Sequence, residues 1–264
     1  MTPSGLRLPA VTVGVDELDL LTHLAGIDEL PVVLDAKSRF DTVVARDAAF
    51  ERCRESLAER GLLPGGHPHP DLVDRLTILA RADVELAVRW YRDGTVSRMC
   101  LAQAGPMTVL ALRGPDSYVL TEVAAAGAEL VLDVIGRGVP LDVDSISAPT
   151  DRLVLALGDL THPQSVAHRL TELGARDTET LAWALSTCTA HAEIVALAQG
   201  DGRRWTSAPV TVFDTAGGRI VGTSTVAPDG TAWSTLGPGG DVRVRQAVGE
   251  LLTWAARPHG AGSS

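Results

Sequence analysis

Two pairs of residues in this chain have types and spacings that could bind a metal. His67 and His69 alternate with prolines, and Cys188 and His191 lie three positions apart. Imidazole and thiolate are common zinc ligands, but a zinc site needs four ligands, and neither pair has nearby residues that complete the set. The prolines favour a solvated loop for the first pair, and apolar neighbours favour ordinary packing for the second. A small enzyme or metal-dependent hydrolase using either pair is the catalytic alternative.

A glycine-rich stretch, Gly237-Pro238-Gly239-Gly240, precedes a helical pattern and superficially suggests a phosphate-binding loop. A P-loop requires Gly-Lys followed by Ser or Thr, because the lysine reaches the phosphates and the hydroxyl binds magnesium. Here Asp241 would place negative charge where a phosphate would lie. The stretch therefore predicts a turn, with Asp241 as the N-cap of the helix.

Asp142 and Asp144 would point to the same side if residues 141–147 form a strand. Paired carboxylates can perform acid–base catalysis when one pKa is raised, but an exposed strand edge or a cap is the simpler interpretation. The chain contains no Gly-x-Ser-x-Gly, His-Glu-x-x-His or dinucleotide-binding motif. No catalytic residue, resident metal or cofactor is predicted.

The segment 90–98 is the strongest candidate for a binding site. It concentrates Trp, Tyr and Arg, the residue types that dominate protein–protein hot spots, around an Asp93-Gly94 turn. The alternative is that Trp90 is buried beneath a sheet while the other side chains are merely solvated. The predicted partner-binding residues are Tyr91, Arg92, Asp93, Thr95 and Arg98.

The elements that must position these residues follow from apolar periodicity and turn signals. In the first half we expect a strand at 11–15, a helix capped by Asp16 and ended by Gly26, and helices at 47–60 and from Asp71. Four strands follow at 84–90, 96–102, 108–112 and 118–123, and then a helix at 124–135.

The second half repeats this plan. We expect a strand at 141–147, a helix capped by Thr150, helices at 165–173 and 178–185, three strands between 208 and 236, and the helix from Asp241. Local echoes separated by roughly 110 residues indicate a pseudo-twofold duplication. The prediction is one α+β domain, 1–257, whose halves 8–137 and 140–257 each hold an antiparallel sheet packed with helices. Residues 258–264 are predicted to form a disordered tail.

Composition restricts the class of partner. A net charge of −10 and a pI near 5.1 argue against nucleic acid and against anionic membranes. Neither a signal peptide nor a run of about 18 apolar residues is apparent. Three well-separated cysteines suggest reduced thiols. We therefore expect a cytoplasmic protein.

Both ends of the sequence resemble a known family. The matching residues are Val11-Thr12-Val13, Asp16-Glu17-Leu18, Leu21, Leu30 to Leu34, Val212-Phe213-Asp214, Gly218 to Gly222, Asp229-Gly230, Trp233-Ser234-Thr235, Pro238-Gly239 and Leu251-Leu252. This pattern resembles the EspG family, the cytosolic secretion-associated proteins of actinobacterial type VII (ESX) systems.

The resemblance implies an EspG-like fold and a function. Such a protein is an ATP-independent chaperone that binds the Pro-Pro-Glu member of a PE/PPE-type heterodimer at a hydrophobic helical tip, keeps it soluble and delivers it for export. The family pattern places the contacts on a sheet loop near the middle of the chain, which here is the tight Asp93-Gly94 hairpin, and on helices of the C-terminal half. A non-catalytic regulatory or scaffolding module that binds a small ligand between the halves is the alternative. The oligomeric state is open, a homodimer included.

Overall fold

The chain forms two compact units in the structure, a computed structural model that describes residues 7–259. Unit 1 consists of Met1–Ala87 and Ser97–Ala126, and unit 2 consists of Val88–Val96 and Gly127–Ser264. Each unit combines antiparallel strands with packed helices, so the predicted α+β class is confirmed. The proposed duplication into halves 8–137 and 140–257 stays a prediction.

Unit 1 combines three helices with antiparallel strands. Its strands, in sheet order, are β1 (Val11–Gly14), β5 (Ser117–Val123), β4 (Met107–Arg113) and β3 (Thr95–Ala104). Its helices are α1 (Val15–Ala25), α2 (Val43–Glu59) and α3 (Pro70–Ala80), with single 3-10 turns at Val32–Leu34 and Pro64–Gly66. Helix α3 packs on β4 and β5, while α1 contacts β1, β5 and α2.

The starts of the first two helices differ from the prediction. Gly14, and not Asp16, is the N-cap of α1, and the Glu17 carboxylate accepts the Gly14 N–H at 2.9 Å. Helix α2 begins at Val43, earlier than expected, because the Thr42 hydroxyl accepts the Ala45 N–H at 3.2 Å. A cap several residues before the apolar pattern therefore extends α2 by a turn that the periodicity does not reveal.

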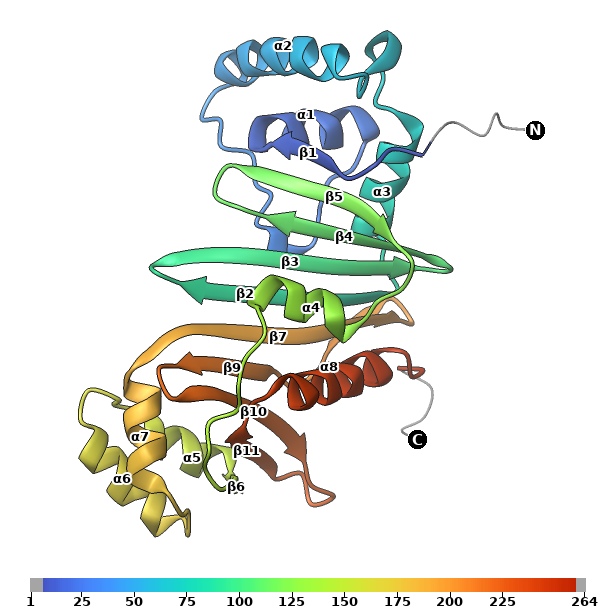
Figure 1. Ribbon diagram of the computed structural model, residues 1–264. Helices are drawn as coiled ribbons and strands as arrows, with labels where there is room; N and C mark the ends of the chain where they lie inside the picture. Colours follow the sequence, from blue (N-terminus) through green and yellow to red (C-terminus); the bar gives the residue numbers. More distant parts are fainter. Residues whose placement is uncertain (1–6, 260–264) are drawn as a thin grey trace. The chain divides into compact units, whose positions relative to one another are not determined.

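Unit 2 contains a further set of antiparallel strands and the remaining helices (Figure 1). Its strands, in sheet order, are β7 (Cys188–Gly200), β9 (Val210–Thr215), β10 (Gly218–Val226), β11 (Ala232–Pro238) and β6 (Ile146–Pro149), with β8 (Arg203–Thr206) paired to β7. Its helices are α4 (Ala128–Ile135), α5 (Thr150–Leu157), α6 (Pro163–Glu172), α7 (Thr178–Ser186) and α8 (Asp241–Ala255). Strand β2 (Val84–Arg92) begins in unit 1 and ends in unit 2.

Helices pack on both faces of the unit-2 sheet. On one face Phe213, Ile220 and Leu236 pack with apolar side chains of α5, α6 and α7 in a single core cluster. Their sequence neighbours Val212 and Val221 point to the opposite face, as alternation in a strand requires, and are also buried. Helix α8 covers that face, because it contacts β7, β9 and β10 and packs against α4.

The predicted strand at 141–147 is wrong in most of its length. Only β6, Ile146–Pro149, is a strand, and Thr150 is the first residue of α5, with Pro149 as its N-cap. The Thr150 hydroxyl instead hydrogen-bonds Ser234 at 2.9 Å. Instead, an isolated bridge joins Pro140 to Arg219, in which the Leu141 N–H donates to the Arg219 carbonyl at 2.9 Å and the Arg219 N–H donates to the Val139 carbonyl at 2.7 Å.

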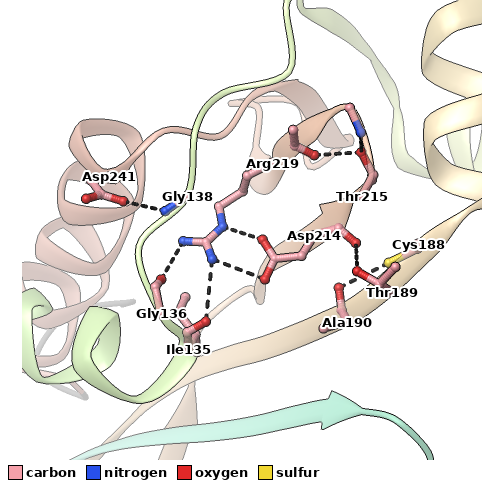
Figure 2. A network of polar contacts seen from close by, with 12 residues as sticks. Ile135, Gly136, Gly138, Cys188, Thr189, Ala190, Asp214, Thr215, Arg219 and Asp241 are labelled. Atoms are coloured by element: carbon pink, nitrogen blue, oxygen red, sulfur yellow. Dashed lines mark hydrogen bonds and ion pairs between the residues drawn. The ribbon is translucent and has the colours of Figure 1, made fainter.

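The crossover from α4 to β6 is held by one buried arginine, Arg219 (Figure 2). Its guanidinium donates to both carboxylate oxygens of Asp214, at 2.6 and 3.1 Å, and its side chain is 2% exposed. It also donates to the carbonyls of Ile135 and Gly136, at 3.5 and 2.9 Å, which lie at the C-terminus of α4. A buried charge thus has a paired counter-charge and further acceptors, as burial requires.

Asp241 also holds this crossover and is not the N-cap of α8, which is Gly240. Its carboxylate accepts the Gly138 N–H at 3.0 Å and pairs with Arg137 at 3.3 Å. The Gly138 hydrogen bond, against a small opposing effect of burial and with help from Arg137, lowers the pKa of Asp241. The acid expected to cap α8 therefore binds a distant segment of unit 2.

The predicted tail begins at Pro258, but His259 is packed. Its ring stacks on Trp205, with centroids 6.1 Å apart, and meets Trp254 at a tilt, with centroids 4.5 Å apart. Its Nε2 lies 3.0 Å from the Trp254 carbonyl oxygen. Residues 260–264 lie outside the described residues. The disordered tail at 258–264 stays a prediction.

Candidate partner-binding surface

The predicted hairpin forms at the expected turn. Strand β2 ends at Arg92 and β3 begins at Thr95, and Asp93 and Gly94 both have positive φ, of 50° and 72°. Two successive positive φ values are typical of the type I′ turn that suits the twist of a hairpin. The Thr95 hydroxyl donates to the Arg92 carbonyl at 2.8 Å and closes the turn. The tip is therefore short and well defined.

Arg92 is exposed at this tip and lies over the indole of Trp90. Its guanidinium carbon is 4.9 Å from the ring centroid, within range of a cation–π interaction. Among the described residues no carboxylate forms an ion pair with Arg92. Trp90 is half-buried rather than fully buried, so this pair presents an aromatic surface with an unpaired positive charge.

Tyr91 points away from this pair and stacks on His191 of β7. The two ring centroids are 4.4 Å apart and the ring planes differ by 10°. His191 lies directly opposite Phe213 of β9 in the sheet register, with centroids 6.4 Å apart. These three side chains, the aromatic row Tyr91–His191–Phe213, all belong to unit 2.

Arg98 does not belong to the tip. It is half-buried in unit 1, where it pairs with Asp35 at 3.4 Å, and Arg113 pairs with the same carboxylate at 2.8 Å. The Arg113 hydrogen bond is the main reason that the pKa of Asp35 is lowered. The structure thus keeps Tyr91, Arg92, Asp93 and Thr95 together in unit 2 and places Arg98 in the other unit.

The residues considered for chemistry have structural contacts in the folded chain. His69 Nδ1 accepts the Asp71 N–H at 3.2 Å and so caps α3. The Cys188 thiol donates to the Ala190 carbonyl at 3.1 Å, and burial raises its pKa. Asp144 lies outside any strand, and its N–H donates to the Asp177 carboxylate at 3.1 Å. Within residues 7–259 no group of three His, Cys, Asp or Glu residues could hold a metal ion.

Sequence reasoning did not identify the exposed apolar side chains of the unit-2 helices. Val154 and Leu155 of α5 are 63% and 74% exposed, and Trp183 of α7 is 53% exposed. All three lie on short helices whose other apolar side chains form the buried cluster. Periodicity assigns apolar helical residues to a core by default. An apolar stripe wider than one face could have indicated them, since Leu153, Val154 and Leu155 are consecutive.

Among the described residues no helix is long and apolar enough to cross a membrane.

Comparison with known proteins identifies the family. A model of the EspG family matches residues 14–250. The ESX-1 secretion-associated protein EspG1 of Mycolicibacterium smegmatis is 29% identical over 221 residues, covering 80% of this chain and 76% of that protein. The ESX-3 secretion-associated protein EspG3 of Mycobacterium tuberculosis is 24% identical over 265 residues, covering 92% of this chain and 90% of that protein.

A solved structure has the same fold. It is the type VII secretion system chaperone EspG5 of Mycobacterium tuberculosis, in complex with a PE25–PPE41 dimer, which matches with a TM-score of 0.77 and 20% identity. The match covers 97% of this chain and 100% of that one. Since the family model spans nearly all of the sequence and the fold agrees, the chain belongs to the EspG family.

Proposed function

We propose that this chain is an ATP-independent cytoplasmic chaperone for type VII secretion. It binds the hydrophobic helical tip of a PE/PPE-type heterodimer, keeps the heterodimer soluble and delivers it for export. The observation that carries the proposal is the exposure of Val154, Leu155 and Trp183 on the helices of unit 2. Large apolar side chains exposed on a soluble protein mark interaction sites when they gather on one surface. Membership of the EspG family supports this reading, as does the partner bound by EspG5.

The hairpin tip adds a second kind of contact. Tyr91 and Arg92 lie in the same unit as α5 and α7, and Arg92 keeps its charge free of ion pairs within the described residues. Aromatic and arginine side chains supply large contact areas at protein interfaces. The proposed surface therefore combines an apolar part on the helices with Tyr91 and Arg92, which point to different sides of the hairpin tip. Arg98, which pairs with Asp35 in unit 1, is not part of this surface.

Co-expression with PE/PPE-type heterodimers from the same genome, followed by affinity capture and gel filtration, tests the proposal. We expect a soluble complex of one chaperone with one heterodimer. Replacing Val154 and Leu155 together by serine should reduce the recovered complex, since both side chains are more than half exposed. Val242→Ser is the matched control, because Val242 is 77% exposed on α8 of the same unit. Capture of no such heterodimer would refute the proposal.

The contribution of the hairpin is tested separately. Tyr91→Ala combined with Arg92→Ala should weaken the complex about tenfold or more without changing the thermal midpoint, because truncation of hot-spot residues typically costs over 1 kcal/mol each. An unchanged dissociation constant would remove the hairpin from the interface. The interface would then be restricted to the exposed apolar side chains of α5 and α7.

The proposed function involves no catalysis and no metal. His69 and Cys188 are engaged in backbone hydrogen bonds, and the thiol has a raised pKa, which disfavours the thiolate that binds metals. We expect the purified protein to contain no stoichiometric zinc after gel filtration, measured by elemental analysis. Retained zinc at one equivalent, lost on changing Cys188 or His67, would contradict this and restore the metal-dependent alternative.

A further inference from the structure

The flat stack of Tyr91 on His191 joins the hairpin tip to the sheet of unit 2. The hairpin tip could present Tyr91 in several rotamers, because the side chain stands on a strand end that is half-exposed. The imidazole fixes one of them, with a ring spacing of 4.4 Å and nearly parallel planes. An aromatic side chain held in advance loses less conformational freedom when it binds a partner.

The row continues from His191 into the core beneath the helices. His191 and Phe213 are direct cross-strand neighbours in the register of β7 and β9. Phe213 in turn packs against the cluster that contains Leu181 and Leu185 of α7 and Leu153 of α5. The contacts therefore run without interruption from the helices that carry the exposed apolar side chains, through Phe213 and His191, to Tyr91.

We propose that His191 is a positioning residue that fixes Tyr91 of the hairpin relative to helices α5 and α7, so that both parts of the docking surface are presented to the heterodimer in one geometry. This inference rests on the proposed function. His191 acts through Tyr91 and through the row, and makes no contact of its own with the partner. The side chain that the sequence paired with Cys188 as a metal ligand instead supports Tyr91, a side chain of the proposed binding surface.

The first test is independent of any partner. A ring stacked face to face shifts the resonances of its neighbour upfield, so the imidazole protons of His191 should move downfield in Tyr91→Ala. His168, exposed on α6 beside Glu172, is the internal reference and should not move. An unchanged His191 signal in Tyr91→Ala would overturn the stacked geometry, whatever the partner.

The second test is a double-mutant cycle with the heterodimer captured by co-expression, measured by calorimetry. His191→Ala should weaken binding about three- to tenfold, the range expected for one aromatic pair, while His191→Phe restores it because the flat ring is kept. In a Tyr91→Ala background, His191→Ala should have no further effect. His168→Ala is the control variant and should bind like the wild type.

The outcomes separate the two proposals. Additive losses from Tyr91→Ala and His191→Ala, or failure of His191→Phe to rescue, would overturn the positioning role while leaving the chaperone function intact. A wild-type protein that binds no PE/PPE-type heterodimer would overturn the function and the inference that rests on it. Thermal midpoints equal to within a few degrees across the variants exclude loss of fold as the cause.

Discussion

Arg219 shows how one side chain can hold together chain segments that lie far apart in the sequence. Its guanidinium reaches Asp214 and the end of α4, while its backbone accepts from Leu141 and Gly239, at 2.9 and 2.8 Å. The residue lies almost fully buried, so its charge depends on these partners. From the sequence alone Arg219 would be taken for an ordinary polar residue of a hairpin. Its role in holding the end of α4 depends on contacts with residues about 80 positions away.

Removing this arginine should be costly. Arg219→Ala leaves the Asp214 carboxylate without its partner and two carbonyls without a donor, and we expect a loss of about 3–5 kcal/mol in the free energy of unfolding. Chemical denaturation monitored by circular dichroism measures it. Arg203→Ala, at an exposed position of β8, is the control and should change stability by no more than about 0.5 kcal/mol. Similar effects of the two substitutions would contradict the network.

Glu17 predicts a pH dependence of stability in unit 1. Burial alone would raise its pKa, but the Gly14 N–H, the Ser56 hydroxyl and Arg60 outweigh it, and the pKa is lowered from 4.5. A lowered folded-state pKa means that the ionised group stabilises the fold at neutral pH. That contribution is lost as the pH falls below the ordinary value and through the lowered one.

We therefore expect Glu17→Gln to be less stable than the wild type at pH 7 and the difference to shrink on acidification below pH 4.5. Urea unfolding at a series of pH values measures both curves. Glu51→Gln, which removes an exposed pair with Arg54 on α2, should give a curve parallel to that of the wild type. A constant difference between wild type and Glu17→Gln at all pH values would contradict the assignment.

At the scale of elements, the turn between β9 and β10 is built around a residue that must lack a side chain. Gly218 has a φ of 140°, and a Cβ there would lie 2.7 Å from the Leu141 nitrogen. Gly218→Ala should therefore destabilise unit 2 by about 1–3 kcal/mol, measured by thermal unfolding. Gly249, inside α8 with open space around it, is the opposite case: Gly249→Ala should stabilise the protein by about 0.5–1 kcal/mol. If both substitutions stabilised the protein, or both destabilised it, the explanation would be wrong.

Local signals in the sequence predicted the meander strands and the tight Asp93-Gly94 turn well, because alternation and turn residues act over a few positions. The strand expected at 141–147 failed, because its apolar alternation reflects packing of a crossover onto the unit-2 cluster and not a hydrogen-bonded ladder. The candidate hairpin was found, but the stacking of Tyr91 on His191 was not, because it joins residues 100 positions apart. Such pairings depend on strand register, which a single sequence does not encode locally.

At the scale of the whole molecule, each of the two units is built from two segments that are not contiguous in the sequence. Residues Val88–Val96 lie in unit 2, although the rest of β2 and β3 belongs to unit 1. The aromatic row contributes to this assignment, since Tyr91 stacks on His191 and is connected through Phe213 to the core of unit 2. The hairpin tip should therefore share the stability of unit 2.

Native-state hydrogen exchange can test this sharing. Destabilising unit 2 with Arg219→Ala should accelerate exchange at the amides of β7 and β9 and also at Val88–Arg92, because local opening follows cooperative units. The amides of β4 and β5 in unit 1 should exchange as in the wild type. Leu76→Ala, at a fully buried position of α3, should destabilise unit 1 by about 2–5 kcal/mol. In that variant the amides of β4 and β5 should exchange faster, and those of β7, β9 and Val88–Arg92 should exchange as in the wild type. If the tip instead follows unit 1 in both variants, the aromatic row does not bind it to unit 2, and the positioning role of His191 fails with it.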